Sequence, residues 1–309
     1  MWQSGRMGLR DEVARALRDL PPGLHKITPP EVRRALRHRL GRFYAWEVGF
    51  DFHDPPAPEA GEVNGPPDFV GIGVQKAGTT WWYRLIMDHP GTSDLLSTPR
   101  DRYFSGPIQK ERHFFGRFGA EDFGPSDIDE YHRWFPRKTG TVTGEWTPDY
   151  LYYPWVPPLV AQAAPDAKLL LILRDPMQRF RSGYAGAIRN GADHVGAAVA
   201  EAVGHSLYAD NVRRWLDHFP ADQLLILLYE ECVASPAQQL ERTYRFLGLD
   251  AAHRPVDLER PVNKTVEAKT RLDDDVSRRL RAIFDPDVAE LAKLLPALDL
   301  GQWVGGGGA

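Results

Sequence analysis

"DFVGIGVQKAGTTWW", residues 68–82, is the stretch that sets the fold expected for this chain. It opens with a short apolar run typical of a buried strand, and "TTWWYRLIMDHP", residues 79–90, continues with helical character. Between them lie Lys76 and Gly78, in a turn where glycine lets backbone N–H groups close on an oxyanion. A helix that begins near Thr79 directs its positive dipole end to the same point. We therefore predict an anion-binding loop between a strand and a helix.

This loop differs from an ATP-binding P-loop in the position of its lysine. Lys76 precedes the Gly-Thr-Thr sequence, whereas a P-loop carries Gly-Lys-Ser/Thr. The spacing therefore predicts an anion site but does not identify the anion.

Two further strand–helix pairs follow along the chain. "AKLLLILRD", residues 167–175, is the strongest buried-strand signal, and a helix is expected over residues 176–190. "DQLLILLYEE", residues 222–231, repeats this pattern ahead of a helix over residues 235–249. Apolar strands separated by helices predict a parallel sheet covered on both faces, with ligands beyond the carboxyl ends of the strands.

A second anion site is expected where the strand at residues 167–175 ends. Arg174 closes this strand, and Ser182 lies on the helix that follows. An arginine at a strand end can contact phosphate through two N–H groups, although a surface pair with Asp175 is the commoner arrangement. Two anion sites at neighbouring strand ends predict a ligand with two separated anionic groups.

Composition limits the class of protein. The 309 residues are 42% hydrophobic with a formal net charge of −4, which allows a sizeable core and excludes a nucleic-acid footprint spread over the molecule. The single cysteine, Cys232, excludes an intramolecular disulfide and is expected to pack in the core. No signal-peptide pattern and no apolar run of about 20 residues is present, so we expect a cytoplasmic protein with no membrane span.

Helical spacing and Pro/Gly content divide the chain into four parts. We predict a helical N-terminal extension over 1–51, a Pro/Gly-rich linker over 52–66, the main domain over 67–303 and a flexible glycine tail over 304–309. The acidic piece "GAEDFGPSDIDE", residues 119–130, is expected to be a surface loop.

The two anion segments, in this order, resemble those of the PAPS-dependent sulfotransferase superfamily. "GVQKAGTTWW" is similar to its 5′-phosphosulfate loop, and "LRDPMQRFRSGY" to its 3′-phosphate segment. The resemblance covers about residues 67–300 and implies an α/β, P-loop-like three-layer fold with a central parallel sheet flanked by helices. It implies PAPS as donor, PAP as product and no metal ion. The donor would contact Lys76, Ala77, Gly78, Thr79, Thr80, Trp81, Arg174, Ser182 and Tyr229.

"KERHFF", residues 110–115, resembles a Lys-Glu-x-His-Phe-Phe segment found in sulfotransferases that modify sugars and in many bacterial relatives. There the glutamate is the general base, which makes Glu111 our first choice and His113 the second, as base or orienter. Without the resemblance, an edge strand with outward charges would be the simpler interpretation. The resemblance also implies that Lys76 stabilises the charge that develops on the leaving phosphate.

"GEWTPDYLYYP", residues 144–154, resembles a family segment usually written Gly-Glu-Lys-Thr-Pro. Trp146 stands where relatives often carry lysine, and Gly116 stands where they often carry an acid. Both changes remove charge, so we expect an acceptor less anionic and more apolar than a sulfated polysaccharide. Phe114, Trp146 and Tyr150 are candidates for contact with it. Trp134, Phe135 and Tyr153 are further candidates, although about half of these aromatic side chains are expected in the core.

The predicted activity is transfer of a sulfuryl group from PAPS to a hydroxyl, with an amine as second choice, of a small molecule or glycoside. A P-loop-type nucleotide-dependent kinase and a non-catalytic nucleotide-binding protein are the alternatives. The missing Gly-Lys-Ser/Thr disfavours the kinase, and the presence of both Lys76 and Glu111 disfavours loss of catalysis. Lys264 or Arg271 is expected either to close over the donor or to lie in a solvated loop, and a homo-oligomer is left open.

Overall fold

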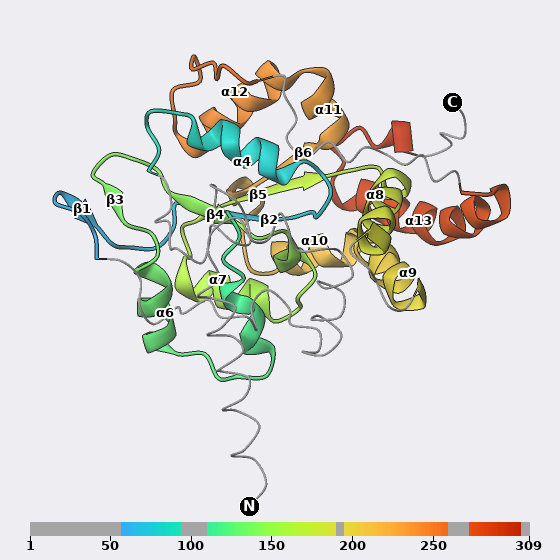
Figure 1. Ribbon diagram of the computed structural model, residues 1–309, viewed down its shortest axis with the longest axis horizontal. Helices are drawn as coiled ribbons and strands as arrows, with labels where there is room; N and C mark the ends of the chain where they lie inside the picture. Colours follow the sequence, from blue (N-terminus) through green and yellow to red (C-terminus); the bar gives the residue numbers. More distant parts are fainter. Residues whose placement is uncertain (1–56, 94–109, 190–194, 259–271, 304–309) are drawn as a thin grey trace, which may run out of the picture.

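A computed structural model describes residues 57–93, 110–189, 195–258 and 272–303, and all structural statements below concern these parts of the chain (Figure 1). The predicted N-terminal extension, the first five residues of the predicted linker and the glycine tail lie outside them, as do Lys264 and Arg271. The predicted domain boundaries therefore stay predictions.

A four-stranded parallel sheet forms the centre of the molecule. Its strands are β2 (Phe69–Gly73), β4 (Gly144–Trp146), β5 (Lys168–Leu173) and β6 (Leu224–Leu228), in the order β4-β2-β5-β6. Every residue of β2 is buried, and so is every residue of β5 after Lys168, as expected for strands covered on both faces. This confirms the predicted α/β fold with a parallel sheet between helices.

Helices cover both faces of this sheet (Figure 1). On one face lie α4 (Thr79–Met87), α11 (Tyr229–Ala234) and α12 (Pro236–Leu247), and on the other lie η2 (Pro148–Leu151), α7 (Val156–Ala163) and α10 (Ala209–Leu216). Long-range hydrogen bonds join α4 to α12. The Trp82 indole donates to Thr243 Oγ1 at 3.0 Å, and the Tyr244 hydroxyl donates to the Leu85 carbonyl at 2.7 Å. These two hydrogen bonds therefore fix the position of α4 relative to α12.

A second, smaller core lies at one end of the sheet. It forms between α8 (Pro176–Arg189), α9 (Val195–Gly204) and α13 (Asp274–Leu294). Its buried members are Met177, Phe180, Ala202, Leu280 and Phe284. Since α8 begins directly after β5, this packing holds the helix that carries the second predicted anion segment.

Short elements complete the described parts of the chain. β1 (Glu62–Val63) lies in the predicted linker and pairs antiparallel with β3 (Arg137–Lys138). α6 (Pro125–His132) replaces the expected surface loop, because Pro125 starts the helix and the Asp127 carboxylate accepts from the Gly124 N–H at 2.9 Å. The 3-10 turns are η1 (Phe114–Gly119), η3 (Ala221–Gln223) and η4 (Gly301–Trp303). Among the described helices, none has the length and apolar character needed to cross a membrane.

Candidate active site

Three of the predicted site segments, together with Thr147, follow the four parallel strands at the same edge of the sheet. The loop 74–78 follows β2, Arg174 follows β5, Tyr229 follows β6 and Thr147 follows β4. This is the edge at which open α/β sheets bind ligands.

The loop between β2 and α4 needs a glycine and is held by two arginines. Gly78 has a φ of 77°, and a Cβ there would lie 3.0 Å from the Tyr229 ring. The Arg174 guanidinium donates to the Lys76 carbonyl at 2.9 Å, and the Arg179 Nε donates to the Gln75 carbonyl at 3.2 Å. Two cations therefore bind the carbonyl side of the loop, which fixes its conformation.

The two predicted anion segments lie together. The Lys76 ammonium lies against α8, since a Cβ added at Gly186 would be 3.4 Å from its Nζ. Ser182 lies one helical turn before Gly186, so both face the same side of α8. Arg174 also lies over the Tyr229 ring, with 4.6 Å between its Cζ and the ring centroid.

The first turn of α4 offers donors to this place. Its N-cap is Gly78, which has no side chain to cap the first N–H groups. Ala77 and Thr79 are buried, and Thr80 is half-buried. Trp81 packs edge-on against Trp82, and its indole N–H is buried without an acceptor among the described residues. The predicted contact of Trp81 with adenine stays a prediction.

Lys110 is a site residue that the sequence did not single out. Its side chain is only 3% exposed, and its ammonium forms an ion pair with Glu111 Oε1. The same Nζ donates to Thr79 Oγ1 and to the Trp146 carbonyl, each at 3.3 Å. Its place directly before Glu111, the predicted base, is the sequence feature that could have identified Lys110 as a site residue.

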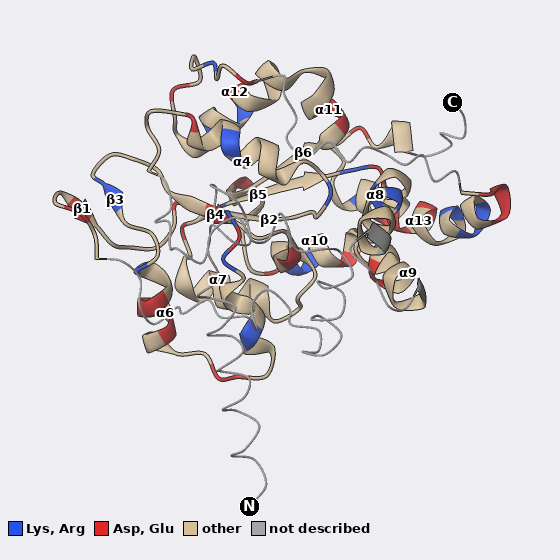
Figure 2. Cartoon of the chain, in the orientation of Figure 1, with Lys and Arg blue, Asp and Glu red and all other residues tan. Residues whose placement is uncertain are grey.

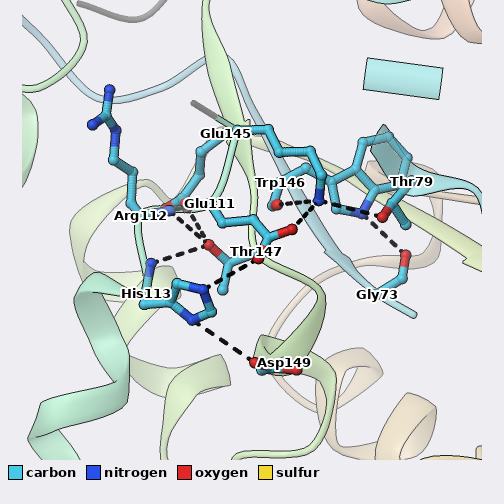
Figure 3. Close-up of polar contacts among 10 residues, drawn as sticks. Gly73, Thr79, Glu111, Arg112, His113, Glu145, Trp146, Thr147 and Asp149 are labelled. Carbon is cyan, nitrogen blue, oxygen red and sulfur yellow. Dashed lines mark hydrogen bonds and ion pairs between the residues drawn. The ribbon is translucent and has the colours of Figure 1, made fainter. Parts of the chain in front are cut away.

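Glu111 and His113 are in contact, and Asp149 lies on the far side of the imidazole (Figure 3). His113 Nε2 lies 3.3 Å from Glu111 Oε2, and His113 Nδ1 lies 3.8 Å from Asp149 Oδ2. The Glu111 side chain is 34% exposed. Burial of its carboxyl disfavours ionisation, but the Lys110 ammonium and the His113 ring outweigh this and hold the pKa of Glu111 at about 2.

The pKa values of His113 and Asp149 are raised, whereas the pKa of Glu111 is lowered. Burial lowers the pKa of His113, but its hydrogen bond to Glu111 and the charge of Asp149 more than compensate and raise it. Burial raises the pKa of Asp149, against the attraction of His113. An ionised carboxylate therefore stands beside an imidazole that holds its proton more tightly than usual.

Close to this group lies a fully buried carboxylate, Glu145 on β4 (Figure 3). The hydroxyls of Tyr131, Tyr150 and Thr147 donate to it at 2.8, 3.1 and 2.6 Å, and the Arg112 N–H donates at 3.0 Å. Burial raises the pKa of Glu145 despite these hydrogen bonds. The last of them ties the segment that carries the predicted base to β4.

The three predicted acceptor contacts, Phe114, Trp146 and Tyr150, are fully buried. The Trp146 indole donates to the Gly73 carbonyl at 3.1 Å, and its ring occupies the space above Gly71, where a Cβ would lie 2.1 Å away. Trp146 therefore packs into the sheet, and contact of these three side chains with an acceptor stays a prediction. Of the further candidates, Trp134 and Phe135 are buried and Tyr153 is partly exposed.

Two further features bear on the chemistry of the described residues. Cys232 is buried, and burial raises the pKa of its thiol, which suits a packing role. In the described parts of the chain, no group of three or more His, Cys, Asp or Glu side chains is arranged to hold a metal ion.

Comparison with known proteins agrees with the fold and the motifs. The model of a sulfotransferase family matches residues 128–253. Human heparan sulfate glucosamine 3-O-sulfotransferase 6 is 30% identical over 223 residues, which are 66% of this chain and 60% of that protein. Human heparan sulfate glucosamine 3-O-sulfotransferase 3B1 is 25% identical over 86% of this chain and 74% of that protein.

A solved structure shares the fold. A sulfotransferase from Alicyclobacillus acidocaldarius superposes with a TM-score of 0.58 at 24% identity, over 77% of this chain and 98% of that chain. In sequence and in fold, the chain is similar to members of the sulfotransferase superfamily. It spans 60% of the length of the first of these relatives.

Proposed function

We propose that this protein transfers a sulfuryl group from PAPS to a hydroxyl of a small-molecule or glycoside acceptor and releases PAP. The observation that carries the proposal is the position of Glu111. Its ionised carboxylate is joined through Lys110 to Thr79, the first residue of the helix that follows the anion loop. A base is thus held beside the place where an anionic donor would bind.

The residues present fit a nucleotide donor with a 3′-phosphate and a 5′-phosphosulfate. Its two anionic ends would require two cationic places at one sheet edge, and the loop 74–78 and Arg174 supply them side by side. The uncapped first turn of α4 would bind the end that carries sulfur. Arg174 and Ser182 would hold the other phosphate, with the buried indole N–H of Trp81 and the ring of Tyr229 nearby.

In sulfuryl transfer the acceptor oxygen bonds to sulfur, the bond from sulfur to the bridging phosphate oxygen breaks, and the hydroxyl proton goes to a base. Glu111 would orient the hydroxyl and accept its proton late, when bond formation has made that proton acidic enough for a weak base. Lys76 would stabilise the charge on the leaving oxygen. His113 would hold the carboxylate in place from its other side.

The acceptor class follows from the charges that face it. Glu111 is ionised, and Asp149 lies on the far side of His113. An anionic group placed next to the exposed part of the Glu111 carboxylate would be repelled by it, which favours an acceptor hydroxyl with weakly charged surroundings. The relatives act, by their names, on heparan sulfate, and a glycoside acceptor would share that chemistry.

The proposal is tested by incubating the protein with labelled PAPS and a panel of hydroxyl acceptors, with ATP and Mg²⁺ as the control for kinase activity. We expect label transfer from PAPS alone. Lys76→Ala should lower turnover roughly 100-fold or more, as expected for loss of a group that stabilises transition-state charge. Transfer from ATP without transfer from PAPS would refute the proposal.

The donor site is tested separately by calorimetry with PAP. Arg174→Ala should weaken PAP binding by about 10- to 100-fold, because hydrogen bonds to charged groups contribute roughly 1.5–3 kcal/mol. Arg254→Ala, an exposed arginine on another part of the surface, is the matched control and should bind PAP as the wild type does. Equal affinity in all three proteins would exclude Arg174 from the donor site.

A further inference from the structure

Lys110 is a buried lysine placed between the anion loop and the proposed base. Its ammonium reaches three structural elements at once. It donates to Thr79 at the start of α4 and to the carbonyl of Trp146 at the end of β4, and it pairs with Glu111 on its own segment. An ammonium has three N–H donors, and each has a partner here.

The burial of this charge needs a reason. Desolvating an ammonium is costly unless it is paired and hydrogen-bonded, and an apolar side chain of similar length would fill the same space at less cost. The partner, Glu111, is itself partly exposed and stands where an acceptor would approach. We infer that a lysine is needed at position 110 for the contacts of its ammonium and not to fill space.

We propose that Lys110 is a positioning residue for the reaction, whose ammonium holds the carboxylate of Glu111 at a fixed place relative to the first turn of α4. The inference rests on the proposed function. Lys110 lies outside the anion loop and would keep the base at a fixed distance from the bound donor. A displacement of about 1 Å between reacting groups can cost 100-fold in rate, so such a tie matters for turnover.

The charged groups around Glu111 determine how its pKa changes when Lys110 is substituted. Lys110 and His113 face the carboxylate from its own segment, and Asp149 faces the imidazole from η2. From α4 the facing group is the neutral hydroxyl of Thr79, and from β4 the nearest charge is the buried Glu145. Without Lys110, His113 is the remaining cationic partner, and the pKa of Glu111 should rise from about 2 toward or above its ordinary value of 4.5.

The first experiment compares Lys110→Met, Lys110→Arg and the exposed control Lys138→Met. Lys110→Met should lower kcat about 100-fold and change PAP affinity much less. The acid side of its pH–rate profile should move to higher pH, because Glu111 then binds a proton more readily. Lys110→Arg should keep the wild-type acid side, and Lys138→Met should match the wild type throughout.

The second experiment needs no activity. The carboxyl carbon of Glu111 is followed by NMR during a pH titration and assigned by its loss in Glu111→Gln. We expect it to stay ionised down to about pH 4 in the wild type, because its pKa is lowered by ion pairing, and to protonate at higher pH in Lys110→Met.

The outcomes separate this inference from the proposed function. If the wild type transfers no sulfuryl group, the proposed function fails while the NMR titration still decides whether Lys110 controls Glu111. If Glu111 titrates alike in the wild type and Lys110→Met, the inference is overturned even in an active enzyme. An equal loss of rate in Lys110→Met and Lys110→Arg with an unmoved acid side would leave Lys110 a packing role and overturn it as well.

Discussion

Two glutamates, Glu111 in the segment 110–113 and Glu145 on β4, show how neighbouring groups determine the pKa of a carboxyl. Glu111 is partly exposed and has two cationic partners, Lys110 and His113. Glu145 is fully buried and accepts four hydrogen bonds, from three hydroxyls and one backbone N–H. The pKa of Glu111 is lowered, and that of Glu145 is raised. Charged partners outweigh burial at Glu111, whereas at Glu145 the hydrogen bonds and the charge of Arg112 together do not outweigh complete burial.

Glu111→Gln is the change with the largest expected effect. It removes the proposed base but keeps the size of the side chain, so we expect kcat to fall about 1,000-fold with PAP affinity and thermal stability near wild type. Steady-state kinetics, calorimetry and thermal unfolding measure the three quantities.

The matched variant His113→Ala tells base from orienter. It should lower kcat less than Glu111→Gln does, because the carboxylate keeps its partner Lys110. A near-normal Glu111→Gln together with an inactive His113→Ala would assign the proton transfer to the imidazole and reverse our choice of base.

Glu145→Gln should act on stability. Its amide NH₂ would face hydroxyl or N–H groups that now donate to the carboxylate, so we expect a loss of roughly 1–3 kcal/mol in the free energy of unfolding. Urea unfolding measures it, with Glu111→Gln as the control that should unfold near the wild-type midpoint. If Glu145→Gln unfolds like the wild type, the contrast between the two carboxylates fails.

The smallest expected effect is in the pH dependence of stability. The pKa of Glu111 is lowered, so its contribution is present above 4.5 and is lost as the pH falls toward 2. The pKa of Glu145 is raised, so its ionisation costs stability as the pH rises. The advantage of the wild type over Glu111→Gln should therefore shrink on acidification, and its advantage over Glu145→Gln should grow. Since Glu111 is one-third exposed, its share stays below about 1 kcal/mol. Urea midpoints between pH 2.5 and 7 that shift in parallel would contradict this.

The central layers could be predicted because long apolar runs specify them. The run 167–175 contains β5 and the helix predicted over 176–190 contains α8, within one or two residues. β4 could not be found in this way, because it has only three residues and is fixed by pairing with β2. The strand predicted over 222–231 was too long, because the chain turns into α11 at Tyr229 once β6 has reached the edge of the sheet.

Sequence motifs identify the anion loop and the predicted base, but they do not show which residues link the two. The sequence predicts Lys76 and Glu111 separately, through a glycine-rich turn and a family resemblance. The tie through Lys110, Thr79 and Trp146 depends on residues 31 and 36 positions apart, which no local pattern records. Arg112 and Arg179 are buried, whereas Figure 2 shows charged residues spread over many elements of the fold.

The indole of Trp146 fits into the space left by a missing side chain on the neighbouring strand, so positions 71 and 146 form one size-matched pair. An engineer who wished to restore the lysine common among relatives at position 146 would leave a hole over Gly71 and would bring a second ammonium close to Lys110. Changing this position without loss of packing thus requires substitutions on both strands. A single substitution at position 146 would be expected to lower stability, which would obscure any effect on the reaction.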